Sequence, residues 1–135
     1  METGRHTFHK NERLCSKKKI AGLIEKGNTI YTPCLKIIWA ENPEATAGPA
    51  QVAFSVPKKS VRLAVTRNLI RRRLREAYRK NKQTLYDFLD SDGVKISFMV
   101  IYRIKEVLDY ETAEKCINDM TSRLIDRIRR RDQKC

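Results

Sequence analysis

The chain has 135 residues, a length that suits a single domain, residues 1–135, with a hydrophobic core of its own. Lysine and arginine number 29 against 16 aspartate and glutamate, a formal net charge of +13, and 41% of residues are hydrophobic. This composition argues against a disordered chain and predicts a polyanionic partner, either nucleic acid or an acidic membrane surface. No apolar run is long enough for a membrane span and no secretory signal is visible, so we expect a cytoplasmic protein.

The four cysteines are spread over the whole chain and form no C-x-x-C pair. This spacing suggests neither a zinc ribbon nor a dense disulfide framework, and we expect Cys34 and Cys116 to be buried thiols. His6 and His9 have no further ligands at a familiar spacing. We therefore expect no metal site at these histidines.

The first predicted element is a short helix. Residues 1–12 are polar, without periodicity, and are expected to form a loose arm. Ile20, Leu23 and Ile24 then stand three and four residues apart, which suits a helix with one apolar face. Gly27 follows at the place where such a helix ends.

Two strands are predicted next. Residues 35–39 and residues 52–56 are rich in β-forming side chains. The turn-forming stretch 42–49 joins them, so we expect an antiparallel hairpin with a long loop. Pro57 interrupts the second strand, and residues 61–64 are interpreted as a short third strand.

A long helix comes after these strands. Residues 67–82 hold neither Gly nor Pro and follow Thr66, a good capping residue. A short apolar piece over residues 85–89 ends at residues 90–93, which fit a helix stop better than a metal site. At 100° per residue, four apolar side chains of the long helix share one stripe: Ile70, Leu74, Ala77 and Tyr78.

Residues 96–102 form an almost continuous apolar run, typical of a buried central strand. Asp109 is expected to cap a last helix that continues to about Arg131, with residues 132–135 as a loose tail. The order is helix, two or three strands, helix, strand, helix, which predicts an α+β sandwich with one small sheet. Three helices cannot each find a sheet face, so part of the sheet is expected to stay open as a groove.

Most of the net charge lies in one segment. Residues 55–82 carry eleven bases against a single acid, Glu76, and so account for +10 of the +13. Guanidinium groups bind phosphate through paired N–H donors, and Arg67, Arg71 and Arg75 rise in steps of about 6 Å along one ridge. A helix that served only solubility would interleave acids with bases. The pattern therefore predicts a nucleic-acid-binding surface.

No residue set has the pattern of an autonomous catalytic centre. The sequence holds no Gly-rich phosphate loop and no paired carboxylates at the ends of predicted strands. Smaller basic clusters at residues 17–19 and 127–134 are compatible with a solvated face or a helix end. The residues alone thus predict a nucleic-acid-binding domain that is not catalytic by itself.

The basic segment from Lys58 to Glu76 follows the pattern K-K-x-x-R-x-A-x-x-R-N-x-x-x-R-x-x-R-E, which resembles the signature of the bacterial ribonuclease P protein subunit. The strand before it, the apolar strand that ends at Arg103 and the long final helix match that family in order and spacing, over roughly residues 12–130. The resemblance implies an α-β-β-β-α-β-α sandwich. It also implies a left-handed crossover around the basic helix, against the general preference for right-handed connections.

The resemblance also implies a function. Family members bind a large catalytic RNA that, with Mg²⁺, removes the 5′ leader from precursor tRNA. The chain would then be a subunit of an endoribonuclease, with ribonuclease P RNA and precursor tRNA as partners and with neither a membrane nor an obligate protein partner. Its Mg²⁺ would be held mainly by the RNA and the substrate. The implied RNA contacts are Lys58, Lys59, Arg62, Arg67, Asn68, Arg71, Arg72, Arg75 and Arg79.

Members of the family also hold the single-stranded leader in a cleft between the first helix and the sheet. The resemblance places Ile20, Ile24, Ile38 and Phe54 at this cleft. Aliphatic side chains pack against a nucleotide but do not stack as an aromatic ring does. For Ile20 and Ile24, ordinary core positions are an equally good interpretation.

Two other functions fit the charge and the fold class. One is a non-enzymatic RNA-binding protein, such as a ribosome-associated protein. The other is a DNA-binding protein that reads the major groove with its basic helix. No clear helix precedes the basic helix to complete a helix-turn-helix pair, which argues against DNA binding.

Overall fold

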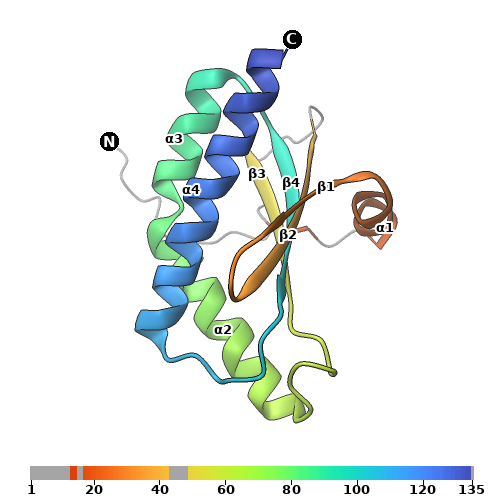
Figure 1. Ribbon diagram of the computed structural model, residues 1–135, viewed down its shortest axis with the longest axis vertical. Helices are drawn as coiled ribbons and strands as arrows, with labels where there is room; N and C mark the ends of the chain where they lie inside the picture. The colour runs from red at the N-terminus through yellow and green to blue at the C-terminus, as the bar shows by residue number, and fades with distance from the viewer. Residues whose placement is uncertain (1–12, 15–16, 43–48, 135) are drawn as a thin grey trace.

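The computed structural model describes residues 13–14, 17–42 and 49–134 (Figure 1). The arm predicted over residues 1–12 lies outside the described residues. The elements, in chain order, are α1 (Lys17–Lys26), β1 (Asn28–Tyr31), β2 (Leu35–Glu41), β3 (Ala50–Ser55), α2 (Ala64–Asn81), α3 (Gln83–Asp92), β4 (Ile96–Tyr102) and α4 (Tyr110–Lys134).

The strands form one mixed sheet in the order β1-β2-β4-β3. β2 pairs antiparallel with β1 and with β4, whereas β3 runs parallel to β4. The predicted hairpin between β2 and β3 is therefore wrong, because β4 lies between them. β4 is the most apolar strand, and this central place buries it on both faces. The α+β class and the central β4 are confirmed, while the handedness of the β3-to-β4 crossover stays a prediction.

The two faces of the sheet are covered unequally. α2, α3 and α4 lie on one face, and α1 lies alone on the other (Figure 1). Alternate side chains of each strand divide between these faces: Ile37 and Phe98 enter the main core, whereas Ile38 and Met99 pack in a smaller cluster with Leu23 of α1. Within the described residues, no helix is both long and apolar enough to cross a membrane.

α2 begins earlier than the sequence predicts. Its N-cap is Leu63, in an extended conformation and without a side-chain capping bond, so Thr66 lies inside the first turn and is not the cap. Residues 61–64 form no strand, because only Val61 of this segment is buried and Leu63 is 71% exposed. The predicted apolar stripe is confirmed, since its four members are the buried residues of the helix: Ile70, Leu74, Ala77 and Tyr78.

The later helices follow the predicted signals more closely. The apolar piece over residues 85–89 is a helix of its own, α3, and it ends at Gly93 in the left-handed conformation, with a φ of 69°. Asp109 caps α4, because its Oδ1 accepts the N–H of Thr112 at 2.8 Å. α4 continues to Lys134, beyond the predicted end at Arg131, so residues 132–134 are helical where a loose tail was expected.

Gly27 fixes how α1 turns into β1. The Gly27 N–H donates to the Leu23 carbonyl at 2.7 Å, and the backbone passes directly over Ile38 of β2. A Cβ at residue 27 would lie 2.5 Å from Ile38 Cγ2 and 2.5 Å from the Leu23 oxygen. Only glycine fits this close approach between α1 and the sheet.

We expect Gly27→Ala to lower the free energy of unfolding by about 1–3 kcal/mol, because the methyl group overpacks the α1–sheet contact. Gly22→Ala is the matched control: a Cβ there meets nothing within 4 Å, and alanine stabilises a helix interior by up to about 1 kcal/mol. Urea unfolding of both variants measures the difference. Equal stabilities for the two variants would show that the α1–sheet contact tolerates a Cβ at residue 27.

Cys34 and Cys116 form a disulfide, where the sequence predicted two buried thiols. Cys34 lies in the turn between β1 and β2, and Cys116 lies in α4, 82 residues further along the chain. The bond ties the β1 edge of the sheet to the helical layer. The sequence held no sign of it, because the two cysteines become neighbours only through the fold.

We expect reduction of the Cys34–Cys116 bond to lower the free energy of unfolding by about 2–4 kcal/mol, since it closes a long loop in the unfolded chain. Unfolding with and without a thiol reductant measures the change, and non-reducing peptide mapping identifies the linked pair. The double variant Cys34→Ala/Cys116→Ala should be insensitive to the reductant. A wild-type stability that reductant leaves unchanged would refute the expectation.

Candidate nucleic-acid interface

The basic segment begins in a tight turn after β3. Val56 and Val61 are buried at the two ends of this turn, and the Val61 N–H donates to the Pro57 carbonyl at 3.1 Å. The two buried valines anchor the turn against the core. Its tip therefore presents Lys58 and Lys59 to solvent.

Arg67 closes this loop onto the start of α2. Its Nη1 donates to the Val61 carbonyl at 3.1 Å and to the Arg62 carbonyl at 2.7 Å. Arg67 thus holds the loop in place as well as adding charge, while the Arg62 side chain is exposed.

Basic side chains continue along the solvent-facing side of α2. Asn68 and Arg72 are exposed, and Arg71 and Arg75 are partly exposed, because the apolar stripe faces the core on the other side. Arg71 Nη1 donates to Asn68 Oδ1 at 2.7 Å. The predicted contacts thus come together on one surface, here called the basic strip: Lys58, Lys59, Arg62, Arg67, Asn68, Arg71, Arg72, Arg75 and Arg79.

Arg79, at the far end of the strip, is engaged with Glu76. Two bonds join them, from Arg79 Nη2 to Glu76 Oε2 at 2.6 Å and from Arg79 Nε to Oε1 at 3.0 Å. This hydrogen bonding lowers the pKa of Glu76 below its usual value and raises the pKa of Arg79. Glu76 is therefore ionised at neutral pH and offsets part of the strip's positive charge at this end.

Arg73 is turned away from the strip. Its Nη1 donates to the Leu108 carbonyl, in the segment that leads into α4. Arg73 was not among the predicted contacts, and the structure gives it a role in joining α2 to the end of that connection.

The predicted leader cleft is only partly assembled. Ile20 is half-buried and Ile24 is 55% exposed, both on α1, so Ile24 is not a core residue. Ile38 is buried beneath α1, where it packs with Leu23 and offers little surface. Phe54 lies on the opposite face of the sheet, with its ring centroid 5.7 Å from that of Tyr78, so its assignment to the cleft is wrong.

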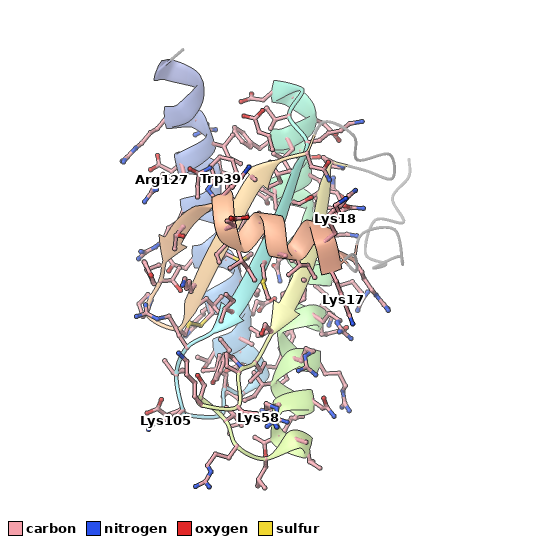
Figure 2. All side chains as sticks on the ribbon, turned by 90° about the vertical axis from the view of Figure 1, so that its right-hand side faces the viewer. Lys17, Lys18, Trp39, Lys58, Lys105 and Arg127 are labelled. Carbon is pink, nitrogen blue, oxygen red and sulfur yellow. A yellow bond between two sulfur atoms is a disulfide. The ribbon has the colours of Figure 1, made fainter. Side chains whose placement is uncertain are left out.

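The sequence reasoning missed the residues that do line the open part of the α1 face. The strand pairing aligns one residue from each of the four strands in a row across the sheet. The residues next to these along each strand point into the main core, so the row lies on the α1 face. α1 crosses the sheet at a distance from the end of the molecule that carries Lys58 (Figure 2). This sheet row consists of Tyr31, Lys36, Ile101 and Ser55.

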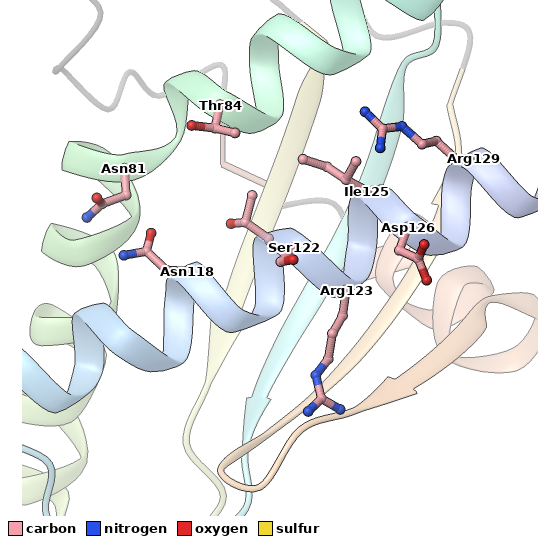
Figure 3. A pocket seen from close by; sticks show the side chains of 9 residues that line it. Asn81, Thr84, Asn118, Ser122, Arg123, Ile125, Asp126 and Arg129 are labelled. Atoms are coloured by element: carbon pink, nitrogen blue, oxygen red, sulfur yellow. The ribbon is translucent and has the colours of Figure 1, made fainter.

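A hollow lies among the helices on the side of the sheet opposite α1. It has a volume of about 640 Å³ and lies between the α2–α3 junction and α4, with Asn81 on one side and Asn118 and Ser122 on the other (Figure 3). Arg123 at its edge is ion-paired with Asp119 at 3.2 Å. The residues around it are chiefly neutral amides and hydroxyls, so its chemistry differs from that of the basic strip.

The described part of the chain contains no group of three or more His, Cys, Asp or Glu residues placed to hold a metal ion. The acids at residues 90 and 92 lie in the last turn of α3, which ends at Gly93.

Fold and site together define a class: an α+β protein that presents arginine-rich helix and loop surfaces to a polyanion. The chain belongs to the ribonuclease P protein component family, whose model, described as Ribonuclease P, matches residues 8–125. It is thus a protein subunit of an endoribonuclease of tRNA processing, and the ribosome-associated alternative is not favoured.

Relatives and solved structures agree with this assignment. The chain is 32% identical over 117 residues to a ribonuclease P protein component of Porphyromonas gingivalis, covering 85% of this chain and 84% of the relative. It is 31% identical over 105 residues to that of Chlorobium phaeobacteroides, covering 72% of each. The RNase P protein of Thermotoga maritima shares the fold, with a TM-score of 0.65 at 20% identity, covering 83% of this chain and 96% of that one. The Staphylococcus aureus protein gives a TM-score of 0.64 at 19% identity, over 80% and 90% of the two chains.

We expect Arg71→Ala and Arg75→Ala each to reduce the slope of log K against log salt for RNA binding by about 1, because each removes one phosphate contact. The wild-type slope should lie at roughly −3 to −5 if the strip releases four to six counterions. Filter binding across a salt series measures both. Arg127→Ala removes the same charge from the opposite end of the molecule (Figure 2) and should leave the slope nearly unchanged. Equal slopes for all four proteins would show that α2 is not the contact.

Proposed function

We propose that the basic strip binds the RNA subunit of ribonuclease P and that the α1 face of the sheet guides the single-stranded 5′ leader of precursor tRNA. The observation that carries this proposal is the continuity of the two surfaces. The strip starts at the turn that follows β3, and the hydroxyl of Ser60 in that turn donates to the Tyr102 carbonyl at the end of β4 at 3.5 Å. One RNA partner on the strip therefore lies next to anything held on the open sheet face.

The chemistry of the strip supports a role in binding and positioning. Guanidinium groups keep their charge at any physiological pH and donate paired N–H groups to phosphate oxygens. Arg67 and the buried valines hold the loop in shape before RNA arrives, which limits the conformational entropy lost on binding. The proposed role of the strip is to neutralise phosphates so that RNA subunit and precursor approach closely.

In this proposal the hydrolytic centre lies in the RNA, and Mg²⁺ is held there and on the precursor. Residues 55–82 contain one carboxylate, Glu76, and Arg79 and Lys80 already neutralise it. The protein's part is electrostatic: it gathers phosphates, and no protein residue is assigned to the cleavage step. We place this activity in the cytoplasm, in keeping with the tRNA-processing role of the family.

We expect the purified protein alone to leave precursor tRNA intact, and to accelerate its cleavage when combined with a ribonuclease P RNA at a Mg²⁺ concentration where that RNA alone is slow. Gel analysis of 5′ leader release measures the rate. The double variant Arg71→Ala/Arg75→Ala should lose much of the acceleration, whereas Arg127→Ala should keep it. The proposal fails if the wild-type protein has no effect at any Mg²⁺ concentration.

A further inference from the structure

Tyr31 is an exposed aromatic residue at the edge of the sheet. It is the last residue of β1, and 53% of its surface is accessible. An exposed aromatic ring on an edge strand brings little burial to the fold and presents an apolar surface to water. A single exposed ring is ordinary on a protein surface, and the charges beside this one set it apart.

Two cations lie over the Tyr31 ring. The guanidinium carbon of Arg103 lies 4.9 Å from the ring centroid, and Lys36 Nζ lies 5.8 Å from it. An aromatic ring beside arginine and lysine is the combination that proteins use to hold single-stranded nucleic acid, because a base stacks on the ring or the guanidinium plane while its phosphates meet the charges.

The backbone around this ring is anchored from both layers of the fold. Arg103 donates through its backbone N–H to the Cys34 carbonyl at 3.1 Å and through Nη1 to the Thr32 carbonyl at 2.8 Å. On the other side, Arg123 of α4 donates to the Tyr31 carbonyl at 2.9 Å. These bonds hold ring and guanidinium in position before any ligand binds, which reduces the entropy lost on binding.

The sheet row leads from this ring to the basic strip. Its four positions span three inter-strand spacings of about 4.8 Å, or about 14 Å in total, which is long enough for a few nucleotides. At its far end, Ser55 is followed within three residues by Lys58 at the tip of the turn. A strand of RNA that stacks on Tyr31 can therefore pass Lys36 and reach the strip.

We infer that Tyr31, with Arg103 and Lys36, forms a stacking platform for one unpaired base of RNA. The inference rests on the proposed function, since it deepens the role given there to the α1 face. The platform supplies the aromatic stacking that the aliphatic Ile20 and Ile24 do not provide. The base belongs to an unpaired RNA segment, either the leader of precursor tRNA or a stretch of the RNA subunit, and the experiment separates these sources.

The test compares the wild-type protein with Tyr31→Leu and Tyr31→Phe in the reconstituted complex of protein and RNA subunit. Leucine keeps an apolar side chain without a ring, and phenylalanine keeps the ring without the hydroxyl. We expect Tyr31→Leu to weaken RNA binding roughly 5- to 100-fold, the loss associated with one base–aromatic stack, and Tyr31→Phe to stay within about twofold of wild type. A full loss in Tyr31→Phe as well would assign the effect to the hydroxyl and overturn the stacking platform.

Three binding measurements identify the source of the base: precursor tRNA with a leader, the same tRNA without a leader, and the RNA subunit alone. A loss confined to the leader-bearing precursor assigns the base to the leader. A loss in binding of the RNA subunit assigns it to that RNA. Wild-type affinity of Tyr31→Leu in all three measurements would overturn the inference.

A fluorescence measurement gives an independent readout of stacking. With 2-aminopurine placed at successive unpaired positions, we expect quenching at one position with wild type and Tyr31→Phe, and its loss with Tyr31→Leu. Urea unfolding of each variant checks that the fold is intact, and Tyr31→Val, which favours a strand, takes the place of Tyr31→Leu if that variant does not fold.

If the wild-type protein accelerates cleavage while no position is quenched, the platform is wrong and the proposed function stands. If it does not accelerate cleavage, the proposed function has failed first.

Discussion

The parallel pairing of β3 with β4 determines where everything else lies. Parallel neighbours cannot be joined by a tight turn, so the chain between them must cross the sheet, and here that crossover consists of α2 and α3. Because β3 and β4 are parallel, both strands also finish at the same end of the sheet. The lysine turn that follows β3 therefore lies beside Arg103, which follows β4. β2 runs antiparallel to β4 and begins at this same end of the sheet, with Leu35 opposite Tyr102. Because β1 is antiparallel to β2, the last residue of β1 lies at this end as well. One pairing thus collects the charges of distant segments at one end of the molecule.

The sequence predicted the elements with strong periodicity and failed on those that depend on pairing. The stripe of α2 and the central strand β4 were visible, because 3.6-residue spacing and a long apolar run have few alternative explanations. The partner of β3 was not, because a strand's own pattern does not say which neighbour it takes. β1 was not predicted, since only Gly27 separates its four residues from α1 and they contain a single buried side chain, Ile30. The start of α2 was misplaced because Leu63, a poor capping residue, holds the N-cap position.

For the site, the sequence located the positive charge but did not show which arginines are bonded to other groups of the protein. The sequence placed Arg67, Arg71 and Arg79 on one surface, yet only the structure shows that Arg67 binds loop carbonyls and that Arg79 is held by Glu76. Phe54 was assigned to the wrong face of the sheet, because successive residues of a strand point to opposite faces. An error of one residue along the strand therefore places the side chain on the wrong face. Tyr31 and Arg103 stand 72 positions apart in the chain, so no motif of the sequence could join them. Their contact depends on the β1–β2 turn and on the end of β4.

The basic strip concentrates like charge on one helix. Arg71, Arg72 and Arg75 lie within two turns of one helix, and their mutual repulsion destabilises the compact state in the absence of a polyanion. Part of this repulsion is offset locally, because Glu76 pairs with Arg79 at the end of the strip. Because a ligand that binds only the folded chain stabilises it by mass action, an RNA bound on the strip would also stabilise α2. The same repulsion that weakens the free protein would therefore favour binding of a phosphate-rich partner on the strip.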